Sequence, residues 1–197
     1  TSTGEADIVL AAPGVHNARN ALGAAAAALA AGVDLAAVRA GLTAFSGIKG
    51  RLQRRIGPNG CMLLDDTYNA NPDSVCAGID VLASTVGRKI LVLGDMGEIG
   101  GMSAQYHDEV GGYAKSQGVD QLLALGEASA QAVRNFGAGG EHFRKIESLI
   151  AALSREMQPG VTVLVKGSRF MRMERVVEAL MAGVGNAAGQ TAGQGER

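Results

Sequence analysis

The sequence predicts an α/β fold in which a doubly wound, mostly parallel sheet follows a small helical segment. From Arg51 onward, short apolar runs alternate with stretches of helical periodicity. Strands that are separated by helices at this spacing indicate a parallel sheet with right-handed crossovers. Two of the runs, CMLL at residues 61–64 and ILVL at 90–93, are apolar throughout. Such runs are typical of strands that are buried on both faces, as parallel strands are.

The composition narrows the class of protein. Hydrophobic residues make up 47% of the 197 residues but aromatic residues only 4%, so the core is built mainly from aliphatic side chains. A net charge of −1 argues against a nucleic-acid partner, which normally requires a basic face. No apolar run approaches the roughly 20 residues of a membrane span. Cys61 and Cys76 are best interpreted as reduced thiols, and we expect a cytoplasmic protein.

The first part of the chain predicts one strand and two helices. Residues 8–12 (IVLAA) are expected to form a short strand that ends at Pro13. The Ala-rich stretch that follows predicts a helix closed by Gly32, and Asp34 is the expected N-cap of a second helix. The glycine-flanked segment 47–50 predicts a hinge between domains. The chain begins TSTGEAD, without an initiator Met or a signal-peptide pattern, so we expect a piece of a longer protein.

Beyond the hinge, the pattern gives each further element in turn. Pro72 is expected to open a helix after the strand at 61–64, and the next strand breaks at Gly94. Ser103 is the expected N-cap of a helix over 103–117. Further helices are predicted over 127–136, 145–157 and 171–181, and further strands over 119–125 and 161–165. The Gly/Ala/Gln-rich tail, residues 184–197, has little to bury and is expected to be disordered.

Three polar loops follow predicted strands, at the edge where open α/β sheets bind ligands. The first, DDTYNANP at residues 65–72, begins with two adjacent carboxylates. An unpaired buried charge costs several kcal/mol, so packing alone does not explain both Asp65 and Asp66. The alternative interpretation is that Asp66 and Asn69 make only turn and helix-cap hydrogen bonds. Both interpretations remain open from these residues alone.

The other two loops are GDMGEIGG and KGSRFMRME. Met96 occupies the position of the second glycine in a dinucleotide-binding fingerprint, where a side chain blocks the approach of a pyrophosphate. This argues against a nicotinamide or flavin dinucleotide. Lys166 and Arg169 flank a helix start, which favours a carboxylate or phosphate site over a merely solvated helix end. At the start of the Ala-rich helix, Asn17 and Asn20 share one face, and paired amides match either a nucleobase edge or an ordinary cap.

The combination of motifs resembles a known family. The chain contains, in order, GVHNARNALGAAAAAL, GIKGRLQ, LLDDTYNANPDS, VLGDMGEIG and VLVKGSRFMRMERVV. Together these motifs resemble the Mur ligase family, and the resemblance extends from about Ile8 to Leu180. It implies that residues 1–48 are the end of a central ATP-binding domain. Residues 49–183 would then form a Rossmann-like carboxyl-terminal ligase domain.

The YNANP, GDMGE and KGSR loops point to one branch of that family. The resemblance implies a ligase that uses ATP and Mg²⁺ to phosphorylate UDP-N-acetylmuramoyl-tripeptide, after which the amine of D-alanyl-D-alanine attacks the acyl phosphate. The chain lacks a Gly-x-x-Gly-Lys-Thr/Ser phosphate loop, so we expect this piece alone to be inactive. We also expect a monomer. The alternatives are a sister ligase such as folylpolyglutamate synthase, or a non-catalytic binding module if the natural chain starts at Thr1.

The resemblance also assigns roles to individual residues, none of them a covalent catalyst or a metal ligand. Asn17 and Asn20 would contact the adenine of ATP, and Arg51 and Asp66 its ribose and phosphates. The residues expected to hold the dipeptide are Asn69, Asn71, Lys166, Ser168 and Arg169.

Overall fold

The computed structural model of the protein describes residues 4–191, with side chains described through residue 182. The chain divides into two compact units, Thr1–Ile48 and Lys49–Arg197. This boundary lies within the predicted hinge at residues 47–50. The two units are described separately.

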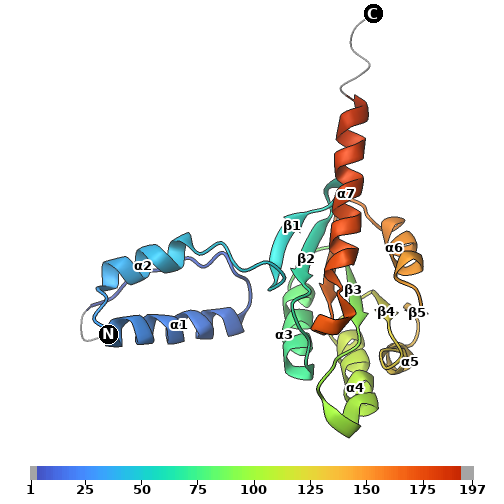
Figure 1. Ribbon diagram of the computed structural model, residues 1–197, viewed down its shortest axis with the longest axis horizontal. Helices are drawn as coiled ribbons and strands as arrows, with labels where there is room; N and C mark the ends of the chain where they lie inside the picture. The colour runs from blue at the N-terminus through green and yellow to red at the C-terminus, as the bar shows by residue number, and fades with distance from the viewer. Residues whose placement is uncertain (1–3, 192–197) are drawn as a thin grey trace, which may run out of the picture. The chain divides into compact units, whose positions relative to one another are not determined.

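The first unit contains two helices that lie side by side, α1 (Val15–Ala30) and α2 (Leu35–Ala44) (Figure 1). Asp34 caps α2 as predicted, because its carboxylate accepts a hydrogen bond from Ala37 N. The prediction of a strand over residues 8–12 was wrong, since this segment has no strand pairing in the described residues and bends at residues 11 and 12. A strand needs a neighbour for its backbone hydrogen bonds, and the described part of this unit offers none.

The second unit is built on a sheet whose order is β1-β2-β6-β3-β4-β5. Five of the strands are parallel, and β1 pairs with β2 in the antiparallel sense. The predicted doubly wound, mostly parallel sheet is therefore confirmed. Its strands within the described residues are β1 (Gln53–Ile56), β2 (Met62–Asp66), β3 (Arg88–Gly94), β4 (Gln121–Leu125), β5 (Gly140–Phe143) and β6 (Val161–Lys166).

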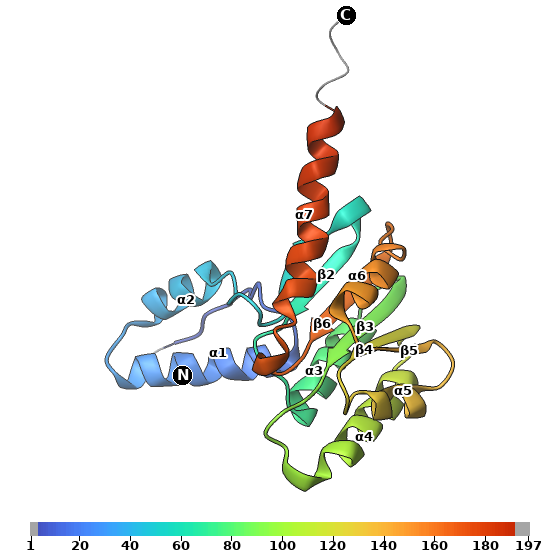
Figure 2. The same ribbon diagram turned by 45° about the vertical axis from the view of Figure 1, so that its right-hand side comes forward.

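Helices cover both faces of this sheet (Figures 1 and 2). On one face pack α3 (Pro72–Ala83), α4 (Ser103–Ser116) and α5 (Ala130–Phe136). On the other face pack α6 (Ile146–Ser154) and α7 (Glu174–Thr191). The connection from β5 to β6 returns across the sheet through α6, and this return places α6 on the second face.

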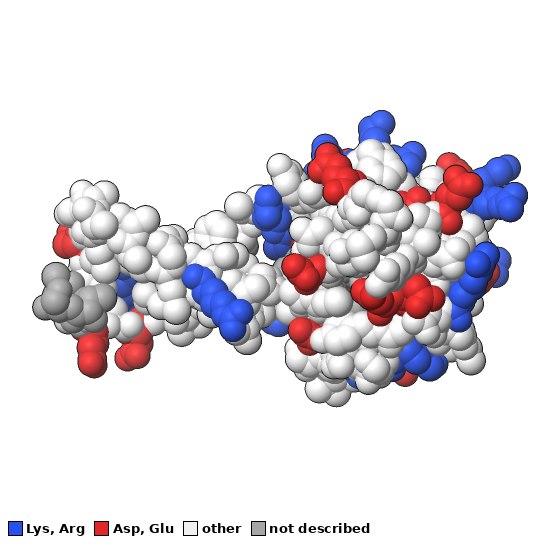
Figure 3. Space-filling view, turned by 90° about the horizontal axis from the view of Figure 1, so that it is seen from below, with Lys and Arg blue, Asp and Glu red and all other residues white. Residues whose placement is uncertain are grey.

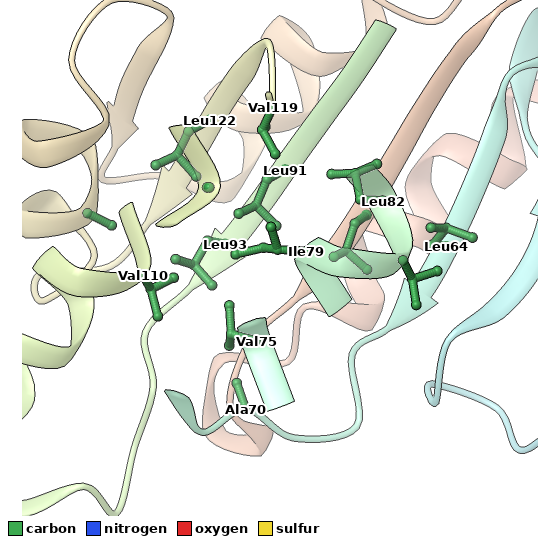
Figure 4. Packing of buried hydrophobic residues seen from close by; sticks show 14 of the residues in the cluster. Leu64, Ala70, Val75, Ile79, Leu82, Leu91, Leu93, Val110, Val119 and Leu122 are labelled. Atoms are coloured by element: carbon green, nitrogen blue, oxygen red, sulfur yellow. The ribbon is translucent and has the colours of Figure 1, made fainter. Parts of the chain in front are cut away.

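The core consists of two aliphatic layers, one on each side of the sheet. Leu91 and Leu93 of β3 pack with Val75 and Ile79 of α3 on the first face (Figure 4). The alternate residues of β3, Ile90 and Val92, belong to the layer on the opposite face. Alternation along a strand sends successive side chains to opposite faces. A strand that is covered on both faces must therefore be apolar throughout, which confirms the interpretation of the ILVL run.

Several helix boundaries differ from the predicted ones. Ser103 is the first residue of α4 and not its N-cap, which is Met102. The helix α7 begins at Glu174, after a short 3-10 turn over Arg169–Met171. It continues to Thr191 and so overlaps the tail expected to be disordered, of which residues 192–197 lie outside the described residues.

The surface shows no single-sign face on the side that Figure 3 displays. There, Lys and Arg side chains alternate with Asp and Glu side chains over the second unit (Figure 3). Across residues 4–191, no helix combines the length and the apolar character needed to cross a membrane.

The close crossing of α4 and α5 gives a test of the packing. A Cβ atom at Gly111 would lie 2.1 Å from the backbone oxygen of Ala132. We expect Gly111→Ala to lower the free energy of unfolding by about 1–3 kcal/mol, because α4 must move away from α5. Gly101→Ala is the control, because a Cβ atom at Gly101, just before α4, would meet nothing within 4 Å and its φ is not positive. Urea unfolding measures both, and equal stability of the two variants would contradict the close crossing.

Candidate functional site

The three predicted ligand loops meet at one edge of the sheet. The strands that precede them, β2, β6 and β3, are neighbours in the sheet order. In the strand register, Asp66 lies opposite Lys166, and Lys166 lies opposite Leu93. The carboxyl ends of the three strands are therefore level, and the loops that follow them lie together. Both Asp65 and Asp66 belong to β2, which extends further than its apolar run suggested.

A buried ion pair joins the first and third loops. Lys166 Nζ lies 2.6 Å from Asp66 Oδ2, and only 3% of the lysine side chain and 12% of the aspartate side chain are exposed. The same ammonium group donates to the backbone oxygen of Asn69 at 2.9 Å. The second carboxylate oxygen of Asp66 accepts from Leu52 N at 3.1 Å. Because both residues face the same side of neighbouring strands, the pair fixes the register at which β2 and β6 end.

The helix α3 approaches this ion pair closely. A Cβ atom at Gly78 would lie 3.1 Å from Leu164 Cδ2 and 3.6 Å from Asp66 Oδ2. Gly78 has a helical backbone, so the absence of its side chain serves the close approach of the helix. The ion pair is thus enclosed between the sheet and α3.

The neighbouring carboxylate of Asp65 points to the other face of the strand, as alternation requires. Its Oδ1 accepts from Thr67 Oγ1 at 2.7 Å and from Thr67 N at 3.3 Å. Its Oδ2 is buried without a hydrogen-bond partner among the described residues. The two adjacent aspartates therefore differ in function: one pairs with a lysine, and the other orders the start of the loop.

The asparagines of the first loop hold local backbone. Asn71 is the N-cap of α3 and forms a capping box with Ser74, in which each side chain accepts from the other's backbone N–H. Asn69 Oδ1 accepts from Ala70 N at 2.9 Å. Both residues are exposed, so their amide groups remain accessible to a ligand in addition to these contacts.

Ser168 links all three loops through one buried residue. Its hydroxyl donates to Ala70 O in the first loop at 2.9 Å and accepts from Gly97 N in the second at 2.6 Å. Its backbone N–H donates to Asp95 O at 3.0 Å. A ligand reaches this hydroxyl only by replacing one of these contacts, because Ser168 is 4% exposed.

Two arginines present guanidinium groups at the surface of the same loops. Arg51 lies over the ring of Tyr68 at 4.4 Å from its centroid, a cation–π contact. Arg169 Nη1 lies 3.3 Å from Glu174 Oε1, and the arginine side chain is 66% exposed. A guanidinium carries five N–H donors, so the contact with Glu174 leaves Arg169 able to bind an anion as well.

Sequence reasoning missed two residues that shape the second loop. The carboxylate of Asp95 accepts from Ser129 N at 2.7 Å and from Ala128 N at 3.3 Å, so it points toward the start of α5. His107 is fully buried, and its Nε2 accepts from Met96 N at 2.9 Å. Its other ring nitrogen must then carry the proton that it donates to Ser103 O at 2.7 Å. No spacing in the sequence marks either contact, because each joins separate elements.

The predicted adenine contacts belong to the first unit. Asn17 and Asn20 lie in the first turns of α1. The amide of Asn17 donates to Pro13 O at 2.6 Å, whereas Asn20 is exposed. The spacing of three residues puts them on one helix face, as predicted.

Some titratable groups of the second unit have shifted pKa values. Burial raises the pKa of the Cys61 thiol, and burial together with the charge of Asp80 raises that of Cys76. A hydrogen bond to Asp80 raises the pKa of Tyr113 to about 12. Both thiols therefore stay protonated at neutral pH, as inert thiols do.

The fold and its edge define a class of protein: a Rossmann-like α/β domain with its ligand loops at the carboxyl ends of parallel strands. The sequence matches the family described as Mur ligase, glutamate ligase domain, over residues 50–169, which include the first two loops and the KGSR segment of the third. The chain belongs to the Mur ligase family.

Relatives with names and solved structures agree with this assignment. The chain is 43% identical over 182 residues to the UDP-N-acetylmuramoyl-tripeptide–D-alanyl-D-alanine ligase of Escherichia coli, covering 91% of the chain and 40% of that relative. It is 42% identical over 184 residues to the enzyme of the same name from Haemophilus influenzae, covering 90% of the chain and 40% of that relative. A crystal structure of MurF from Acinetobacter baumannii has a TM-score of 0.82 at 35% identity, covering 92% of this chain and 41% of that one. The chain thus spans about 40% of the length of the curated relatives that it matches.

The buried ion pair gives a test of the site's architecture. We expect Lys166→Met to lower the free energy of unfolding by about 3–5 kcal/mol, because it leaves the Asp66 carboxylate buried without its counter-ion. Adding Asp66→Asn should restore part of that loss, since the double variant buries no unpaired charge. Urea unfolding measures both. If the double variant were no more stable than Lys166→Met, the pair would not be the source of the loss.

Proposed function

We propose that this chain is the carboxyl-terminal part of an ATP-dependent ligase that adds D-alanyl-D-alanine to UDP-N-acetylmuramoyl-tripeptide in peptidoglycan synthesis. The observation that carries the proposal is the meeting of the three loops, DDTYNANP, GDMGE and KGSR, at one sheet edge. The names of the curated relatives support the same substrates.

In the proposed reaction, ATP phosphorylates the carboxylate of the tripeptide and leaves as ADP. The amine of the dipeptide then attacks the acyl phosphate, the amide bond forms, and inorganic phosphate leaves. The residues of this chain act by holding the two reactants in the attacking geometry and by excluding water. Positioning of this kind accounts for several kcal/mol of a reaction barrier.

We assign the nucleotide to Asn17, Asn20, Arg51 and Asp66, with the asparagines at the adenine. Each oxygen of the Asp66 carboxylate makes one contact within the protein and keeps a second lone pair for a ribose hydroxyl. Arg51 is exposed and held on Tyr68, so its guanidinium is already ordered for a phosphate. Ordering before binding reduces the entropy lost on binding.

We assign the acceptor dipeptide to the loop that follows β6. Arg169 is the exposed cation of that loop and suits the dipeptide carboxylate through its planar fork. Lys166 and Ser168 are buried, and they act in the proposal by holding the loop in place beneath the dipeptide. Asn69 and Asn71 lie in the facing loop, where their exposed amides complete the site.

The proposal includes Mg²⁺ as the partner of the ATP phosphates. Among the described residues, no three His, Cys, Asp or Glu side chains gather to hold a metal ion. As the family resemblance implies, we propose that the ligands of this ion lie outside the present chain, and we derive no step from the ion. The present chain alone is proposed to be inactive.

The function itself is tested by the complete natural protein in a ligase assay. Product formation should require ATP, UDP-N-acetylmuramoyl-tripeptide and D-alanyl-D-alanine together, with one phosphate released for each amide formed. Product formed with glutamate in place of the dipeptide would indicate the sister ligase. A natural chain that starts at Thr1 and forms no product would indicate a binding module.

The nucleotide assignment predicts the behaviour of Asp66→Asn. The amide keeps the shape of the carboxylate, and its oxygen still accepts from Lys166, but the lysine loses its counter-ion. Urea unfolding of this variant is therefore the control for a loss of stability. We expect the KM for ATP to rise about tenfold, because hydrogen bonds to a charged group contribute about 1.5–3 kcal/mol. The KM for the dipeptide should change little. Steady-state kinetics on the complete protein measure both, and an unchanged KM for ATP would refute the assignment.

The acceptor assignment predicts the opposite pattern for Arg169→Ala. The KM for D-alanyl-D-alanine should rise at least tenfold, because alanine cannot replace the guanidinium fork, and the KM for ATP should stay the same. Arg169→Lys serves as the control and should recover only part of the loss. Equal effects on both substrates would instead indicate that Arg169 supports the start of α7.

A further inference from the structure

Phe170 is an exposed aromatic residue in a chain that has few. It lies in the short 3-10 turn Arg169–Met171 that follows β6, and 63% of the residue is exposed. The sequence has only four Phe, three Tyr and no Trp. The other exposed aromatic residue of the second unit is Tyr68, whose ring is in a cation–π contact with Arg51. None of the roles proposed above involves Phe170. Its exposed position therefore requires an explanation of its own.

The ring of Phe170 lies against the backbone of the second loop. A Cβ atom at Gly97 would lie 2.7 Å from Phe170 Cε1 and 3.2 Å from Cδ1. Gly97 is not among the glycines with positive φ, so its backbone does not require glycine, and the missing side chain serves the ring. Gly97 N is in turn bonded to Ser168 Oγ at 2.6 Å. One edge of the ring is held in place, while most of the residue stays open to solvent.

We propose that Phe170 is a specificity-determining residue that contacts the methyl group of the acceptor's carboxyl-terminal residue. This inference rests on the proposed function, and in particular on Arg169 as the partner of the acceptor carboxylate. Neighbouring residues have Cα atoms 3.8 Å apart, and the methyl group of an alanine is attached beside its own carboxylate. In this proposal, an acceptor whose carboxylate is held by Arg169 lies beside the 3-10 turn that carries both residues, with its terminal methyl group against the exposed part of the Phe170 ring.

The contact supplies selectivity through apolar burial and not through a hydrogen bond. Removing a methyl group from water against the ring favours an acceptor that ends in alanine over one that ends in glycine. One buried methyl group corresponds to about a fourfold preference.

The test compares D-alanyl-D-alanine with D-alanyl-glycine as acceptors for the complete protein. We expect Phe170→Ala to lower the preference for D-alanyl-D-alanine, measured as the ratio of kcat/KM values, about fourfold with the KM for ATP unchanged. Gly97→Ala should act in the same direction, because its Cβ displaces the ring without backbone strain. Phe170→Leu should retain part of the preference.

Val86→Ala is the matched control, because Val86 is an exposed apolar residue just before β3, at the opposite edge of the sheet. It should leave the preference unchanged. The inference would be overturned if Phe170→Ala left the acceptor preference unchanged, or if it raised the KM for ATP and did not lower the preference. If Arg169→Ala still raised the acceptor KM, the proposed function would survive that result. If the wild-type protein did not use D-alanyl-D-alanine, the proposed function itself would fail.

Discussion

The ion pair between Asp66 and Lys166 is the interaction on which the functional edge depends. Two opposite charges lie 2.6 Å apart in a space almost closed to water, so neither tolerates the loss of the other. A buried pair of this kind contributes more to the choice of strand register than to stability. If one strand shifted by one residue, the two charged side chains would lie on opposite faces of the sheet and could not pair. The pair thereby fixes the height at which β2 and β6 end, and with it the starting points of two of the three loops. Gly78 allows α3 to cover the pair, so the same interaction also sets the position of that helix.

Beyond this pair, hydrogen bonds of buried side chains join the three loops to one another and to neighbouring helices. Ser168 joins the first and second loops, Asp95 joins the second loop to the start of α5, and His107 supports the second loop from α4. These buried contacts hold the loops in fixed positions at the carboxyl ends of the strands. Arg51, Arg169 and Phe170 remain exposed at the surface of this edge, whereas Asp66, to which we assign the ribose, is mostly buried. Buried hydrogen bonds that hold the loops in this way are the support that a preorganised binding site requires.

The sequence predicted what depends on local pattern, and it failed where distant residues decide. Alternating apolar runs and helices gave the parallel sheet, and Asp34 gave a helix cap, since these follow from neighbours in the chain. The pairing of Asp66 with Lys166 joins residues 100 positions apart, and no pattern reports the register that brings them together. The edge strands β1 and β5 were missed because QRRI and GEHF are only half buried and carry few apolar side chains. The apolar run IVLAA was mistaken for a strand because local composition does not show whether a pairing partner exists.

The strand order has a consequence for how the chain assembles. The last strand to be made, β6, lies between β2 and β3, the first two parallel strands. Until residue 166 has left the ribosome, β2 with its hairpin partner β1 and the β3-β4-β5 group are two separate pieces without a common hydrogen-bonded edge. The central contacts are thus among the most distant in sequence, and topologies dominated by such contacts fold slowly. During synthesis, the facing edges of the apolar strands β2 and β3 keep unpaired backbone groups until β6 inserts between them. Unpaired edges of this kind favour association with other chains. The same late strand brings Lys166, so the charge of Asp66 is neutralised in the step that closes the sheet.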